Sequence, residues 1–210
     1  TRALAAVATG DPVYRQQLEP GAILTRVAKS HIRIGTVQFF AMTRQGAGLN
    51  ELVTYVTERH YLGALEKARQ LDPEATHAQV LLNEVTRALA SLVAHWQALG
   101  FIHGVLNTDN MLLCGETVDY GPCAFMDTFA AGQVFSSIDT GGRYAFGNQP
   151  GMVHWNLSVL AQCLLPLLNE DQDKALALAQ DSVDQFPSLF AEIYSARLAA
   201  KFGLDAMRES

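Results

Sequence analysis

The chain has 210 residues, 49% of them hydrophobic and 17% charged, which is the composition of a folded globular protein and excludes a disordered chain. A net charge of −6 argues against a broad nucleic-acid or anionic-membrane surface, and no apolar run reaches the roughly 18 residues of a membrane span. The three cysteines form no CxxC pair and have no histidine at metal-ligand spacing, so we expect free thiols in a reducing compartment.

The N-terminal part is rich in residues that favour strands. Residues 1–9 are apolar, and Gly10-Asp11-Pro12 after them predicts a turn. Residues 22–29 and 36–44 are enriched in Val, Ile, Thr and Phe, which predicts two further strands.

Two arginines flank the connection between these last two strands. Arg26 lies inside an otherwise apolar strand, where a charge needs a partner or an anion. Arg33 lies in the connection itself. An arginine is most often a solvated surface residue, but this pair could together hold a phosphate.

The rest of the chain is predicted to be mainly helical. Gly46-Ala47-Gly48 is expected to be a joint, and it is followed by apolar residues at helical spacing up to a break at Asp72-Pro73-Glu74. The strongest amphipathic pattern covers residues 75–99, with Gly100 as its expected C-terminal cap. Further helices are predicted at 152–168, with Trp155 buried, and then at 172–185 and 188–202, which Phe186-Pro187 separates.

Between the helical segments lie two polar stretches. The first, Gly100 to Met111, is followed by Asp119-Tyr120-Gly121-Pro122. The second, residues 130–151, is longer than the roughly 12–15 residues usual for a structureless loop, and its aromatic residues favour an ordered conformation. The fold class is therefore α+β, with a β-containing part before a mainly helical part, which is the order of lobes in kinase-like folds.

The first stretch has the frame of a kinase catalytic loop but lacks its base. Kinases place an acid two residues after a histidine, an asparagine five residues after that acid, and an Asp-Phe-Gly motif further on. Here His103 and Asn110 match the frame, and Asp119 stands in the position of the later acid. Val105 occupies the position of the base and cannot accept a proton, which excludes ordinary kinase chemistry through that position.

Asp109, directly beside Asn110, is the candidate replacement for the base. Asn110 and Asp119 would then hold Mg²⁺ through hard oxygen ligands, and the metal would offset phosphate charge. Read alone, Asp109-Asn110 is more often a turn or a helix cap. The flanking His-Gly and Asp-Tyr-Gly favour a magnesium–phosphate site over a turn or cap.

In combination these motifs resemble the SelO family (YdiU, selenoprotein O) of pseudokinase protein adenylyltransferases. The residues that carry the resemblance span nearly the whole chain: TRALA at 1–5, Pro20-Gly21-Ala22, Arg26-Val27-Ala28, 30–35, GFIHGVLNTDNM at 100–111, DYGP at 119–122, GRYAFGNQP at 142–150 and Trp155-Asn156-Leu157.

The resemblance implies transfer of AMP from ATP to Ser, Thr or Tyr hydroxyls of proteins, with release of pyrophosphate and with ATP flipped relative to kinases. It implies that Asp109 accepts the proton and that Asn110 and Asp119 bind Mg²⁺ or Mn²⁺. Asp119 would also contact the nucleotide, whose phosphates Arg26 and Arg33 would hold.

The resemblance also implies a division into a remnant of the β-containing lobe (1–45) and a helical lobe (46–210). The latter would contain the catalytic loop (100–111), the DYG metal segment (119–121) and an activation-loop-like segment (130–151). The family's glycine-rich segment, lysine and glutamate would precede Thr1, and a C-terminal part would follow. We therefore expect this piece alone to be inactive and its independent folding to be compromised.

Two alternatives remain at this point. One is a nucleotide-binding pseudokinase or scaffold without catalysis, which suits the isolated fragment; the other is a small-molecule phosphotransferase, which Val105 disfavours. The expected partners are ATP and hydroxyl-bearing proteins, with no nucleic acid or membrane. The expected location is the bacterial cytoplasm, or the mitochondrion in a eukaryote.

Overall fold

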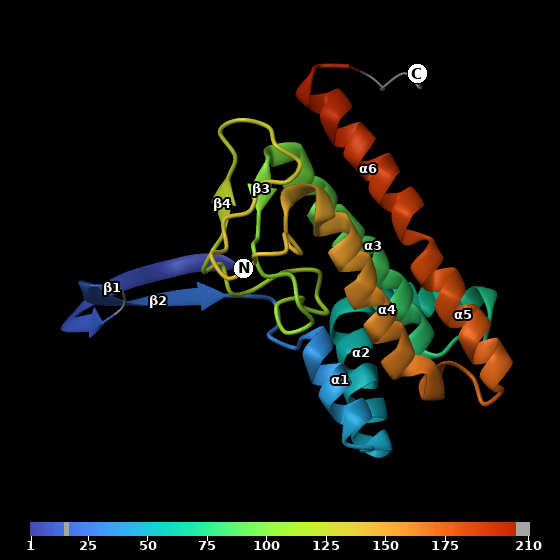
Figure 1. Ribbon diagram of the computed structural model, residues 1–210. Coiled ribbons are helices and arrows are strands. Elements are labelled where there is room, and N and C mark those ends of the chain that lie inside the picture. Colours follow the sequence, from blue (N-terminus) through green and yellow to red (C-terminus); the bar gives the residue numbers. More distant parts are fainter. Residues whose placement is uncertain (15–16, 205–210) are drawn as a thin grey trace. The chain divides into compact units, whose positions relative to one another are not determined.

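A computed structural model describes residues 1–14 and 17–204 and has a mixed α+β fold (Figure 1). It divides into two compact units, residues 1–31 and 32–210. The elements are β1 (Arg2–Tyr14), β2 (Leu18–Val27), α1 (Ile34–Met42), α2 (Gly46–Leu71), α3 (His77–Leu99), β3 (Phe101–Ile102), β4 (Ala124–Phe125), a 3₁₀ turn η1 (Phe146–Asn148), α4 (Gln149–Leu168), α5 (Gln172–Asp184) and α6 (Phe186–Lys201).

The first unit is an antiparallel hairpin of β1 and β2, which confirms the strands predicted at 1–9 and 22–29. The turn predicted at Gly10-Asp11-Pro12 is wrong, because β1 continues through it to Tyr14. The strand register instead shifts between Ala8 and Pro12. The Thr9 hydroxyl accepts from the Asp11 N–H (3.2 Å) and donates to the Gly21 carbonyl (3.1 Å), so a side chain supports the ladder where the strand bulges.

The hairpin has almost no buried apolar surface of its own. Only Gly21 is buried in its two strands, and large apolar side chains such as Leu4 (72% exposed) and Ile23 (62%) face solvent. A two-stranded hairpin without a packed face is marginally stable in water.

The second unit is built around α3, which packs against α2, α4, α5 and α6 (Figure 1). Most of its apolar stripe is buried, and Val153, Leu157, Leu160 and Leu164 of α4 belong to the same core. The largest fully buried side chains are Ile34, Leu81, Leu82, Leu89, Ile102, Leu106, Met111, Leu112, Leu113, Leu157, Leu160 and Leu164. Five of these lie between Ile102 and Leu113, a segment that includes most of the stretch 100–111, called the central loop below. Much of this loop is therefore buried in the core.

The structure confirms the helices predicted from periodicity. Thr76 caps α3 by accepting a hydrogen bond from the Gln79 N–H, and Gly100 ends it in the left-handed conformation (φ 70°), as expected. Helix α2 ends at Leu71, before the predicted break, and has one kink at Tyr61. Phe186 and Pro187, predicted to separate two helices, form the first turn of α6.

The strand predicted at 36–44 is wrong, because these residues form α1. Ile34 and Val37, one helical turn apart, are fully buried in the common core. The Arg33 N–H donates to the Thr36 hydroxyl (3.1 Å), which supports the start of the helix. Packing of this face outweighs the strand propensity of Thr, Val and Phe, which spans only about 1 kcal/mol.

Three local predictions of the second unit also need correction. Gly46 begins α2 and is therefore not in a linker. The loop predicted over 130–151 ends at Ala145, after which η1 and α4 follow. Trp155, expected to be buried, is 46% exposed on α4, where the Arg143 guanidinium lies over its ring at 5.0 Å.

By length and composition, the segment Phe146–Leu168 would fit a membrane span. It contains Val153, Leu157, Leu160 and Leu164, all fully buried against neighbouring helices. A long apolar helix in a protein core has the same length and hydropathy as a membrane span, so this similarity is weak evidence for one.

The contact between α3 and α6 gives a test of local electrostatics. The Arg197 Nη1 lies 2.9 Å from His95 Nδ1, and partial burial together with the Arg197 charge lowers the pKa of His95. With the folded pKa below the unfolded one, the unfolded chain binds more protons, so this pair lowers stability as pH falls through the unfolded value of about 6.5.

We expect Arg197→Gln to raise the His95 pKa, because one of its two causes is removed. An NMR titration of the His95 ring in both proteins would measure this change. A pKa that does not move would assign the shift to burial alone.

Candidate functional site

The central loop begins where α3 ends. After Gly100, β3 pairs with β4 through Phe101–Phe125 and Ile102–Ala124, and the chain then enters the core at His103, which is fully buried. The His103 ring lies between Trp96 (5.6 Å between centroids) and Tyr120 (5.4 Å).

The hydrogen bonds of His103 define its role. Its Nδ1 accepts from the Val105 N–H (3.3 Å), and its Nε2 lies 3.0 Å from the Val118 carbonyl and 2.9 Å from the Thr117 hydroxyl. Because Nδ1 accepts, the proton of a neutral ring is on Nε2. His103 thus ties the loop to the segment before Asp119 and has a structural task rather than a catalytic one.

A glycine brings the two motifs into contact. Gly104 has φ +87°, and a Cβ placed on it would lie 2.8 Å from Pro122 Cγ and 3.1 Å from the Pro122 carbonyl oxygen. The His-Gly of the loop and the Pro of Asp-Tyr-Gly-Pro therefore pack directly on each other.

We expect Gly104→Ala to destabilise the full-length protein by at least the roughly 1–2 kcal/mol that a left-handed residue with a Cβ costs, plus the clash with Pro122. Thermal unfolding would measure the loss. Gly142→Ala is the matched control, since Gly142 also has positive φ (+66°) but meets no atom closer than 3.9 Å. Equal losses in the two variants would contradict the importance of the Pro122 contact.

The second half of the loop is held by the N-terminus of α1. The Gly35 N–H donates to the Thr108 carbonyl (2.9 Å), and the Ile34 N–H donates to the Met111 carbonyl (2.9 Å). The Thr108 hydroxyl also donates to Gln38 Oε1 (3.1 Å). The first N–H groups of a helix lack partners within it, so the loop satisfies them and is fixed by them.

This attachment places Asp109 against Gly35. The Asp109 side chain is exposed, and a Cβ on Gly35 would overlap its Oδ1. The Asp109 N–H donates to Asn107 Oδ1 (3.1 Å). The predicted proton acceptor thus has a carboxylate that faces solvent beside the positive end of α1. The backbone on each side of it is held by the bonds of Thr108 and Met111 to this helix.

Asn110 is buried (5% exposed). Its Nδ2 donates to the Val105 carbonyl (2.9 Å), and its own carbonyl accepts from the Thr117 hydroxyl (2.7 Å) and the Val118 N–H (3.1 Å). With Nδ2 engaged inward, Oδ1 is the atom suited to a cation.

Asp119 follows Val118, so the backbone beside it is bonded to Asn110. It has φ +62°, rare for a residue with a Cβ, and its side chain is exposed. Aspartate tolerates this conformation better than most residues, and such strain is found mainly at functional sites.

The two predicted arginines lie in different units. Arg33 is the N-cap residue of α1, is exposed, and pairs with Leu112 of the loop region. The prediction that Arg33 lies in a connection between two strands is therefore wrong. Arg33 lies at the helix end that holds Asp109. Arg26 is half-buried in β2 opposite Ala3, and its role stays a prediction.

The donor set fits a magnesium ion that keeps waters and phosphate oxygens among its ligands. No group of three or more His, Cys, Asp or Glu side chains that could hold a metal occurs within residues 1–14 and 17–204. Mg²⁺ bound with nucleotides takes one or two protein carboxylates and completes its shell with phosphates and water, which Asn110 and Asp119 could accommodate.

Sequence reasoning missed two buried amides of α4 that contact this loop, Gln149 and Asn156. Both belong to the motifs GRYAFGNQP and Trp155-Asn156-Leu157. The available signal was an amide within an apolar helix, since a buried polar group requires a partner.

Comparisons with known proteins agree with this arrangement of motifs. A family model described as protein adenylyltransferase SelO matches residues 1–210. Among similar proteins, the protein nucleotidyltransferase YdiU of Rhodopseudomonas palustris is 53% identical over 204 residues, covering 97% of this chain and 40% of that protein. The proteins of the same name from Methylorubrum populi and Bacillus cereus are 51% and 50% identical, each covering 100% of this chain and 41% of the relative.

The chain thus spans about 40% of the length of these relatives, consistent with a fragment. A match over the whole chain, with identities near one half, leaves no ambiguity of family. The chain belongs to the SelO family of protein adenylyltransferases.

Proposed function

We propose that the full-length protein transfers AMP from ATP to Ser, Thr or Tyr hydroxyls of proteins and releases pyrophosphate. The observation that carries the proposal is the pairing of an exposed Asp109 carboxylate, held at the N-terminus of α1, with Asn110, whose backbone is bonded to the segment that ends in Asp119. The family match supports the reaction class.

In this proposal Asp109 accepts the proton of the acceptor hydroxyl. The hydroxyl oxygen forms a bond to the α-phosphorus of ATP, and the bond between that phosphorus and the bridging oxygen of pyrophosphate breaks. Arg33 would hold the phosphates by bidentate hydrogen bonds, and the family resemblance implies the same role for Arg26. A magnesium ion on Asn110 and Asp119 would supply charge compensation for the phosphates.

The proposed fold is kinase-like, with ATP flipped so that the α-phosphate faces the acceptor. Val105 supports this reading over phosphotransfer. Its carbonyl accepts from Asn110 and its N–H donates to His103. At the position where kinases have their catalytic base, this chain therefore has only backbone hydrogen bonds and an apolar side chain that cannot accept a proton.

The test uses full-length protein, a protein substrate or the enzyme itself as acceptor, and ATP labelled on either the α- or the γ-phosphorus in the presence of Mg²⁺. We expect covalent label only from α-labelled ATP, with a mass increase equal to AMP. Transfer of the γ-label would establish a kinase instead, and binding of ATP with neither transfer would favour a non-catalytic pseudokinase.

A further inference from the structure

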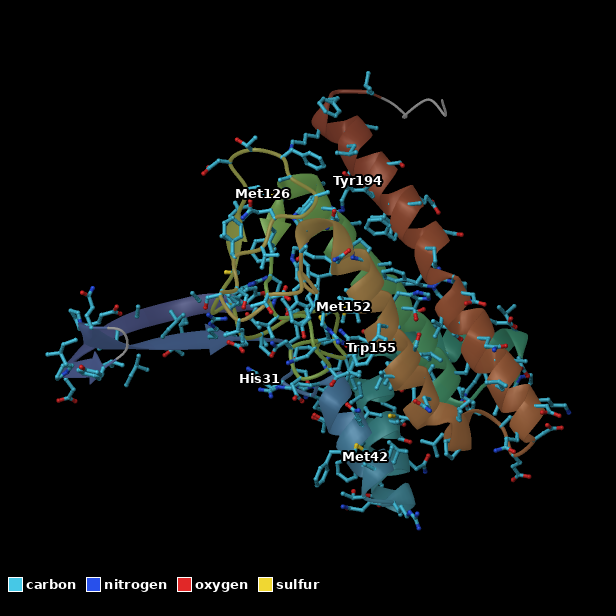
Figure 2. The ribbon with its side chains drawn as sticks, in the orientation of Figure 1. His31, Met42, Met126, Met152, Trp155 and Tyr194 are labelled. Carbon is cyan, nitrogen blue, oxygen red and sulfur yellow. The ribbon has the colours of Figure 1, made fainter. Side chains whose placement is uncertain are left out.

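Helix α4 sends two fully buried amide side chains to the backbone of the loop. Gln149 Oε1 accepts from the His103 N–H (2.9 Å), and its Nε2 donates to the Phe101 carbonyl (2.9 Å). Asn156, two turns further along, donates from Nδ2 to the Leu106 carbonyl (3.0 Å). The part of α4 between them, which carries Met152 and Trp155, is shown in Figure 2.

The position of Asn156 is unfavourable for an amide. Its neighbours Val153, Leu157 and Leu160 are fully buried apolar residues. Its Oδ1 is buried and accepts no hydrogen bond from any described residue. An unsatisfied buried acceptor reduces stability, so the bond from Nδ2 to the loop is the favourable interaction that this amide makes.

The bond to Leu106 is the last attachment of the loop to α4 before Asp109. The next attachments, at Thr108 and Met111, are to α1. The chain therefore passes from α4 to α1 between Leu106 and Thr108, and Asp109 follows directly after the α1 end of this short span.

We propose that Asn156 is a positioning residue: its Nδ2 fixes the Leu106 carbonyl and so sets the start of the segment that presents Asp109. The proposal rests on the proposed function for the role of Asp109. The two buried amides of α4 differ. Both the Oε1 and the Nε2 of Gln149 are hydrogen-bonded to the loop backbone, whereas only the Nδ2 of Asn156 is bonded and its Oδ1 is not.

The first test is Asn156→Leu in the full-length protein. Leucine has a similar shape and removes the unpaired Oδ1, but it also leaves the buried Leu106 carbonyl without this donor. The two effects on stability oppose each other, so we expect a Tm close to that of the wild type. We expect kcat for AMP transfer to fall on the order of 10-fold or more, since small misplacements of a reacting group have effects of this size, with KM for ATP changed less than about twofold.

Asn83→Leu is the matched control. Asn83 lies on α3, and its Oδ1 is likewise buried without a hydrogen-bond partner, but no hydrogen bond joins it to the loop among the described residues. We expect its kcat to equal that of the wild type. A normal kcat in Asn156→Leu, or an equal loss in both variants, would overturn the proposal.

Two readouts keep the test decisive. Hydrogen exchange of the amides of residues 107–111 should accelerate in Asn156→Leu whether or not the protein transfers AMP. Unchanged exchange would overturn the positioning role of Asn156 even where the proposed reaction fails.

If Asn156→Leu does not fold, the variant Asn156→Asp tests the same role. A carboxylate cannot donate to the Leu106 carbonyl, but a carboxylic acid can. The activity of Asn156→Asp relative to the wild type should therefore rise as pH falls. Activity equal to that of the wild type at every pH would refute the positioning role of Asn156.

Discussion

An Asp109→Asn variant of the full-length protein is expected to lose AMP transfer by on the order of 10²- to 10⁴-fold in kcat, the range usual for removal of a general base. The amide has the same shape as the carboxylate, and the bonds that hold the segment come from backbone atoms of Asp109, Thr108 and Met111. The backbone should therefore stay in place while the proton acceptor is lost.

The measurement is initial-rate kinetics with α-labelled ATP, together with ATP affinity and Tm, both of which should change little. Asp173→Asn is the control, because it makes the same charge change at an exposed residue in the first turn of α5. Full activity in Asp109→Asn would remove Asp109 from the chemistry and leave the base unassigned.

A second large effect is expected from Gly35→Ala, a change outside the loop. A Cβ at this position would overlap Asp109 Oδ1 and lie 3.1 Å from its Cγ, so the carboxylate must rotate away. Alanine is about 1 kcal/mol more favourable than glycine in a helix, so α1 itself should not suffer. We expect kcat to fall on the order of 100-fold with little loss of stability.

Gly63→Ala provides the comparison for this variant. Gly63 lies within α2, and a Cβ there meets no atom within 4 Å, so the helix gains the same propensity without touching the site. We expect normal kinetics and a slightly higher Tm. If Gly35→Ala also keeps normal kinetics, the Asp109 carboxylate does not act from the place where α1 holds it.

The candidate site is fixed mainly by backbone bonds, which explains its sensitivity to small residues. Gly35 leaves room for Asp109, and Gly104 leaves room for Pro122. The polar side chains that complete the arrangement, His103, Asn110 and Asn156, each bond to a main-chain atom of the loop or of the segment before Asp119.

The helices were predictable because their signals are local. The apolar spacing of residues 75–99, the Thr76 cap and the left-handed Gly100 all act within α3, and helix periodicity does not depend on distant contacts. Prediction failed at α1, where the local preference for a strand is weaker than the burial of Ile34 and Val37 by other helices.

The sequence by itself determined the resemblance to the SelO family, the valine at position 105 where a kinase motif has its base, and the choice of Asp109, Asn110 and Asp119 as candidates, because motifs consist of residue types at fixed spacings. Only the tertiary structure decided what holds them. The overlap between Gly35 and Asp109, and the bonds of Gln149 and Asn156 to the loop, join residues more than 40 positions apart. No local periodicity encodes such contacts, since they arise only when α1 and α4 pack beside the loop in a common core.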